Sequence, residues 1–130
     1  MEDADFTDDF CRFIQTAIPS VDAAEVLLFA KRQRESTWTA GEIGAQLRPA
    51  VAVTDAEVAK YLDALVQHGV LALGADRRVQ FRPRSEEIEM YTEMLALAYR
   101  VRPVTLIRMI YALRDSRIRT FADAFKLRKD

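Results

Sequence analysis

The sequence predicts a mainly α-helical domain that carries one small β-hairpin. Three observations predict this fold class. Apolar residues recur at helical spacing along most of the 130-residue chain. Thr39 with Glu42, and Thr54 with Glu57, have the spacing of capping boxes, so each pair is expected to start a helix. The stretch HGVLALGADRRVQF has a short apolar run, then a turn of small residues, then a run that alternates apolar and polar residues, which is typical of a hairpin.

Composition limits the class of protein. Half of the residues are apolar and 30% are charged, as in an ordinary globular domain, and a chain of this length fits a single domain over residues 1–130. No apolar run approaches the roughly 20 residues of a membrane span, and the acidic N-terminus is unlike a signal peptide. The single cysteine, Cys11, excludes an internal disulfide. We therefore expect a cytoplasmic protein without a membrane partner.

The residue types also argue against an enzyme. One histidine and one cysteine cannot assemble the usual zinc ligand sets, and neither common Gly-rich phosphate loop occurs. His68 is expected to cap a helix end or face solvent, and Cys11 to behave as a small apolar residue. We expect no catalytic site, no cofactor and no metal.

The first element is an acidic helix within residues 1–19, which Pro19 and Ser20 separate from a second helix. The two ends of the chain carry opposite charge. Residues 1–30 hold seven acidic side chains against Arg12, whereas residues 100–130 hold nine basic side chains against three acidic ones. These ends could be solvated surfaces that pair with each other, or arms that meet partners.

The middle of the chain, about residues 21–83, predicts a helix-turn-helix followed by a hairpin. Ser20 can cap the helix that begins at Val21, and the capping boxes at Thr39 and Thr54 start the next two helices. Gly69 lies where the last of these helices ends and a positive φ is needed. The hairpin then follows directly, with Gly74-Ala75-Asp76 as its turn, which is the winged-helix arrangement.

The run WTAGEIGAQL…TDAEVAKYLDALVQHGVL…DRRVQF, within residues 21–83, resembles the winged helix-turn-helix domain of bacterial MarR-type transcriptional regulators. The resemblance implies that the helix after Thr54 is a recognition helix and that the hairpin is a DNA-contacting wing. It also implies a homodimer held by the flanking helices. Lys60 falls where this family usually carries a basic residue.

The C-terminal extension covers residues 85–130. Ser85 caps a long helix, Pro103 restarts or kinks it, and the segment PVTLIRMIYAL is apolar nearly all round. Such a helix either lies in the core or is buried against a partner. As a dimer or partner interface we single out Leu106, Ile107, Met109, Ile110, Leu113, Phe121 and Phe125, the last two from a short basic terminal helix.

Binding to double-stranded DNA is the leading functional expectation, because basic side chains lie in and beyond the predicted wing. The candidate DNA-binding residues are Thr54, Lys60, Gln67, Arg77, Arg78, Arg82 and Arg84. The wing arginines could instead be solvated on an exposed hairpin.

The recognition helix argues the other way, since its outward positions are rich in alanine and include Asp55, Glu57 and Asp63, which phosphates would repel. The alternative function is a non-enzymatic adaptor that uses the same fold to bind a protein.

Overall fold

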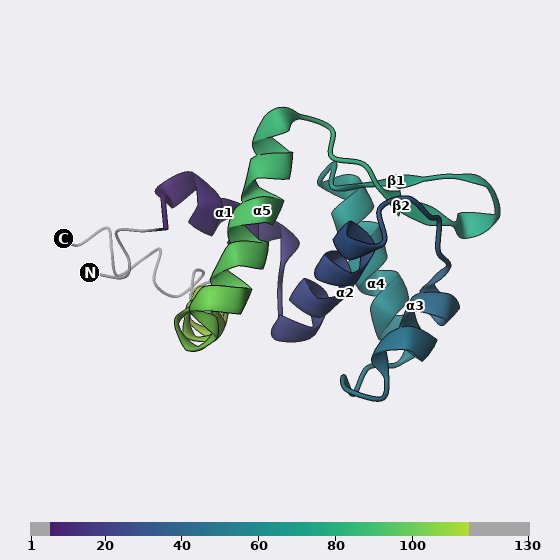
Figure 1. The fold of residues 1–130 in the computed structure, drawn as a ribbon, viewed down its shortest axis with the longest axis horizontal. Helices are drawn as coiled ribbons and strands as arrows, with labels where there is room; N and C mark the ends of the chain where they lie inside the picture. The colour runs from purple at the N-terminus through teal and green to yellow at the C-terminus, as the bar shows by residue number, and fades with distance from the viewer. Residues whose placement is uncertain (1–5, 115–130) are drawn as a thin grey trace, which may run out of the picture.

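The computed structural model describes residues 6–114 and is mainly helical, with a small two-stranded antiparallel sheet, as predicted (Figure 1). The helices are α1 (Asp8–Ala17), α2 (Val21–Arg32), α3 (Ala40–Leu47), α4 (Asp55–Gln67) and α5 (Glu86–Val101), followed by a helical segment over residues 103–114. The strands are β1 (Leu71–Leu73) and β2 (Val79–Phe81), joined through a 3-10 turn, η2 (Ala75–Arg77).

Both predicted capping boxes are present. At α4, the Thr54 hydroxyl accepts a hydrogen bond from the Glu57 backbone N–H at 3.1 Å, and the Glu57 carboxylate accepts one from the Thr54 backbone N–H at 2.9 Å. Thr39 and Glu42 form the same pair of bonds at α3. These bonds satisfy backbone groups that have no partner within the helix, so the two helices begin where the sequence predicts.

The hairpin is extended on one side by the chain before α3. Leu71 pairs with Phe81, and Leu73 pairs with Val79. The backbone of Trp38 in turn bonds that of Val79 in both directions, at 2.9 and 2.8 Å. The hairpin is therefore fastened along β2 to the segment that leads into α3.

Helix α2 lies between two halves of the molecule (Figure 1). On one side, α3, α4 and the hairpin pack against it, with Val26 and Leu27 fully buried. On the other side, α1 packs against α5, where the rings of Phe13 and Tyr91 lie 5.3 Å apart. One continuous apolar core runs through both halves.

The structure shows which residues of the apolar segment 103–114 face the core. Leu106 and Ile110 are buried in the core of the same protomer, so they are not available to a partner in this fold. Ile107, Met109 and Leu113 are half-buried, and Val104 and Tyr111 are exposed. The other two candidate interface residues, Phe121 and Phe125, lie outside the described residues.

Within the described range 6–114, no single helix is long and apolar enough to cross a membrane. Helices α1 and α2 reach that length only together, and they meet at a bend of 99°.

Because Leu106 is buried in the core, Leu106→Ala should leave a cavity and lower the free energy of unfolding by about 2–5 kcal/mol. The matched control Tyr111→Ala, on the exposed side of the same helix, should cost less than about 1 kcal/mol. Denaturant unfolding at several protein concentrations measures both. A loss for Leu106→Ala that appears only at high protein concentration would show that this side chain acts in an interface instead.

Candidate nucleic-acid interface

Helix α4 presents a mixed outer face. Lys60, Asp63 and Gln67 are exposed, with the small side chain of Ala59 half-buried between α4 and the hairpin. Lys60 forms no ion pair with any residue from 6 to 114. The helix therefore offers one free cation and one amide to a ligand.

Two of the three carboxylates on α4 are engaged within the fold. Asp55 accepts a hydrogen bond from the Arg48 guanidinium at 2.7 Å, and Glu57 belongs to the capping box. Asp63 has no such ion pair in the described part of the chain. Thr54 is exposed but its hydroxyl serves the helix cap, so its role in the structure is to start α4.

Arg78 fastens the hairpin rather than extending into solvent. Its Nε donates to the Thr37 hydroxyl at 2.9 Å, and its Nη2 donates to the Thr37 carbonyl and to Glu42 Oε1, both at 3.0 Å. The backbone N–H of Thr39, together with Arg78, lowers the pKa of Glu42 below its ordinary value. The β2 end of the turn is thus tied to the N-terminus of α3.

Arg77, Arg82 and Arg84 are exposed and make no ion pair with another described residue. Arg77 stands at the tip of the hairpin, where it and Asp76 have φ values of 57° and 58°. The Arg84 side chain lies over Gly69, whose φ of +78° favours glycine, and an added Cβ there would come 2.6 Å from Arg84 Nε. The positive φ is therefore what favours glycine at position 69, because the flexible Arg84 side chain can move away from an added Cβ.

A groove of about 280 Å³ lies between α4 and the hairpin. Ala59, Leu62 and Asp63 form its α4 side, and Leu73 and Arg77 form its hairpin side. Leu73 is 57% exposed although it lies on the same side of the sheet as buried Val79. The groove therefore combines an apolar floor with charges of both signs.

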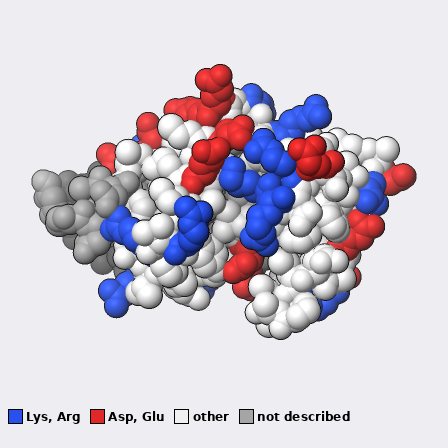
Figure 2. All heavy atoms as spheres, viewed as in Figure 1, with Lys and Arg blue, Asp and Glu red and all other residues white. Residues whose placement is uncertain are grey.

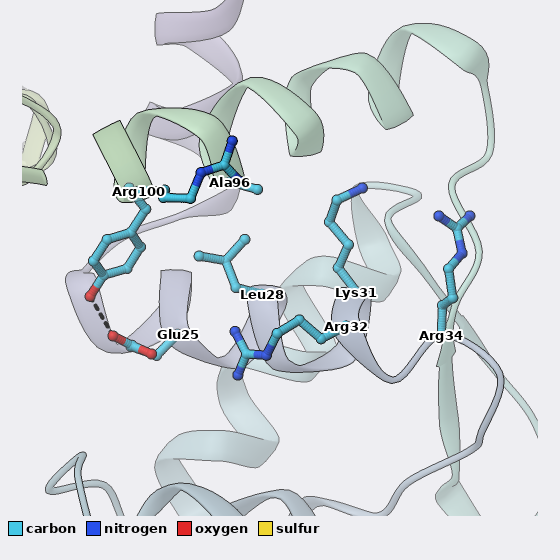
Figure 3. Close-up of a pocket in the computed structure, with 8 residues that line it drawn as sticks. Glu25, Leu28, Lys31, Arg32, Arg34, Ala96 and Arg100 are labelled. Atoms are coloured by element: carbon cyan, nitrogen blue, oxygen red, sulfur yellow. Dashed lines mark hydrogen bonds between the residues drawn. The ribbon is translucent and has the colours of Figure 1, made fainter. Parts of the chain in front are cut away.

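A second basic region, absent from our sequence-based predictions, is a cleft of about 500 Å³ between α2 and α5. Figure 3 shows Leu28 between the two helices, with Arg100 and Ala96 on α5 and Lys31 and Arg32 on α2. Arg34 lines the same cleft. Across the middle of this face, Figure 2 shows lysine and arginine side chains gathered in a band with acidic side chains around it.

Part of this positive charge is compensated inside the fold. Lys31 lies 3.9 Å from Glu93, and Arg34 lies 3.1 Å from Glu89, both acids being on α5. Arg32 makes no ion pair among residues 6–114, and neither does Arg100. The only sequence signal for this cleft is the run KRQR at residues 31–34, because the partner helix comes some 55 residues later.

Glu25 also borders the cleft and accepts a short hydrogen bond from the Tyr99 hydroxyl (Figure 3). Burial, with the Glu25 carboxylate beside it, raises the pKa of Tyr99 well above its ordinary value. The phenol consequently stays protonated, and this bond joins α2 to α5 at the far end of the cleft from Arg34.

His68 is the C-cap residue of α4, as expected from its position, and Cys11 is half-buried with its Sγ 3.7 Å from the Met109 sulfur. Among the described residues, no group of three or more His, Cys, Asp or Glu side chains could hold a metal ion.

Comparison with known proteins finds no matching family model, no similar curated protein and no similar solved structure.

Arg77 and Arg78 are neighbours at the hairpin turn, but only Arg78 is hydrogen-bonded to the segment before α3 and to Glu42. Arg78→Ala should lower the melting temperature by about 4 °C, because it removes charge-assisted hydrogen bonds between the hairpin and the start of α3. Arg77→Ala should leave the melting temperature within about 1 °C of the parent value. Thermal unfolding followed by circular dichroism measures both, and equal effects from the two variants would contradict the fastening role of Arg78.

The lowered pKa of Glu42 predicts a pH dependence. Its ionised carboxylate stabilises the fold at pH above its ordinary pKa of 4.5, and this contribution is lost as the pH falls through the lower folded-state value. The stability difference between the parent and Glu42→Gln should therefore be largest near neutral pH and shrink on acidification below 4.5. Denaturant unfolding at a series of pH values tests this, and a difference that stays constant would contradict it.

Proposed function

We propose that this chain is a winged-helix transcriptional regulator that binds double-stranded DNA, with α3 and α4 as the helix-turn-helix and the β1–β2 hairpin as the wing. The observation that carries the proposal is that Arg77, exposed and without an acidic partner among the described residues, lines the same groove as the outer face of α4. A helix and a cationic hairpin side by side are what a duplex needs for a groove contact and a phosphate contact together.

In the proposed complex, the other exposed basic residues also contact the DNA. Arg82 and Arg84, at the base of the hairpin, supply further phosphate contacts. Lys60 and Gln67 act from α4, and the small side chain at Ala59 leaves room for close approach to the duplex. Thr54 and Arg78 serve as positioning residues, since one starts α4 and the other holds the wing. As a DNA-binding regulator, the protein would act in the cytoplasm. It would need no cofactor and would catalyse no reaction.

Salt dependence tests the proposal. Binding of the full chain to duplex DNA should weaken steeply between about 50 and 200 mM salt, and each phosphate contact removed should reduce the slope of log K against log salt by about 0.9. Replacing Arg77, Arg82 and Arg84 with alanine should therefore weaken binding and flatten that slope. Fluorescence anisotropy with a labelled duplex provides the measurement.

Arg108→Ala is the matched control for these variants, because Arg108 is exposed on the segment 103–114, away from the hairpin. It should leave both the affinity and the slope unchanged. If the parent chain does not bind duplex DNA at the lower salt, or if the control weakens binding as much as the hairpin variants do, the DNA proposal fails.

A second candidate function, a protein-binding adaptor, is favoured by one observation. The groove between α4 and the hairpin exposes Leu73 and contains Asp63 and Asp76, which suit a basic peptide with an apolar side chain better than a phosphate backbone.

Asp63→Lys separates the two functions. It should raise DNA affinity several-fold, because it replaces a repulsive charge with an attractive one, whereas it should weaken an adaptor's hold on a basic peptide. The parent and the variant are compared in the anisotropy assay with the same duplex. Unchanged or weaker DNA binding by Asp63→Lys would place this face of α4 outside a DNA contact.

A further inference from the structure

We propose that the cleft between α2 and α5 is a docking site for an acidic amphipathic helix of a partner protein. An apolar side chain of that helix would lie on Leu28, and its carboxylates would bind Arg32 and Arg100. The inference goes beyond the DNA proposal, because it uses no residue of α4 or the hairpin. It gives a role to the second basic region, which a duplex on the hairpin leaves unused.

Three side-chain contacts join α2 and α5 across the cleft. The Tyr99 hydroxyl donates to the Glu25 carboxylate near one end, and the Arg34 guanidinium lies 3.1 Å from Glu89 at the other. Between them, Lys31 donates to a buried threonine hydroxyl of α5 at 3.3 Å. The helices are therefore antiparallel, and the contacts fix their separation before a ligand arrives, which lowers the ordering cost of binding.

The floor of the cleft is apolar between the first two of these contacts. Leu28 of α2 and Ala96 of α5 lie opposite each other there, in the antiparallel register that the contacts set (Figure 3). The small side chain at position 96 leaves space beside Leu28, in a cleft of about 500 Å³. An apolar side chain placed in this hollow would be removed from water, which favours binding.

A second hollow continues the cleft along α5. It also has a volume of about 500 Å³, and it shares Lys31, Ala96 and Arg100 with the first. Met90 and Leu97, each 51% exposed, border it. Together the two hollows present apolar atoms over about two turns of α5, which suits the apolar stripe of a short helix.

Two arginines without an acidic partner among residues 6–114 flank this floor. Arg32 lies one turn after Leu28 on α2, and Arg100 lies one turn after Ala96 on α5. Because the helices are antiparallel, the two arginines are displaced from the floor in opposite directions. Figure 3 shows their guanidinium groups on opposite sides of Leu28.

This order of charges matches an acidic amphipathic helix. A guanidinium binds a carboxylate through two parallel hydrogen bonds, so each arginine can take one acidic side chain. A helix with one acid a turn before an apolar residue and another a turn after it places all three on one face. The apolar residue would then meet Leu28 while the acids meet Arg32 and Arg100.

The surroundings of the cleft favour separate carboxylates over a phosphate backbone. Glu89 and Glu93 lie on its α5 border, and Figure 2 shows further acidic side chains around the basic band. A duplex presents a continuous row of phosphates, which would meet these acids as well as the arginines. A peptide can carry its acids only where the arginines are, so charge complementarity selects a peptide.

Binding of a model peptide to the full chain tests the proposal. The probe is a fluorescein-labelled helical peptide of alanine and glutamine that contains one leucine, with a glutamate four residues before it and another four residues after it. The matched control peptide has glutamine in place of both glutamates. In anisotropy titrations at about 50 mM salt, the glutamate probe should bind at least tenfold more tightly than the control, because only it forms charge-assisted pairs.

Variants of the cleft locate the contact. Arg32→Ala and Arg100→Ala should each weaken binding of the glutamate probe by about fivefold, whereas Arg108→Ala, on the segment 103–114, should leave it unchanged. Ala96→Trp should weaken binding of both peptides, since it fills the hollow beside Leu28 without changing charge. Circular dichroism confirms that each variant is folded before it is scored.

Any of three results would overturn the proposal. The parent chain could fail to bind the glutamate probe at about 200 μM protein, a concentration that reveals even a weak complex. The two peptides could bind equally, or Arg32→Ala and Arg100→Ala could bind the glutamate probe as the parent does. Finally, the same two variants could weaken duplex DNA binding as much as the hairpin variants do, which would make the cleft a nucleic-acid surface instead.

Discussion

The contact of two cations with the ring of Phe81 is the interaction on which the arrangement of the fold depends. The ring is buried, with Lys31 Nζ 4.9 Å and the Arg34 guanidinium carbon 4.8 Å from its centroid. Those same cations pair with Glu93 and Glu89 on α5. The end of α2 thereby holds the hairpin on one side and α5 on the other.

Ion pairs within the fold leave only some of the described basic residues free for a ligand. Arg34, Arg48 and Arg78 fasten elements to one another, through Glu89, Asp55 and Glu42 respectively. Because these guanidinium groups are already satisfied, the net positive charge offered to a ligand comes from the other cations. On the hairpin these are Arg77, Arg82 and Arg84, so a ligand that recognises positive charge would meet the hairpin first and α4 second.

Local signals made most of the fold predictable. The capping boxes at Thr39 and Thr54, the glycine at position 69 and the apolar residues on both sides of the hairpin turn each depend on residues within a few positions of one another. The structure contains all of them. The segment 103–114 was harder, since a helix that is apolar nearly all round has no periodicity to reveal its inner face. Only packing shows that Leu106 and Ile110 point inward.

The candidate site was less predictable because its decisive contacts join distant parts of the chain. Arg78 was a predicted DNA contact, but its partners Thr37 and Glu42 lie 41 and 36 residues away. The cleft between α2 and α5 could not be inferred for the same reason. Charge pattern located the basic residues, but it could not separate those that fasten the fold from those that remain free.

The most direct test of the account is to locate the duplex on the protein. Backbone amide NMR spectra of the full chain, titrated with a short DNA duplex at low salt, report which residues meet the ligand. We expect the largest shifts at residues 73–84 of the hairpin and in the first half of α4, with little change in the segment 103–114. Shifts confined to the cleft between α2 and α5, or no shifts at all, would contradict the account.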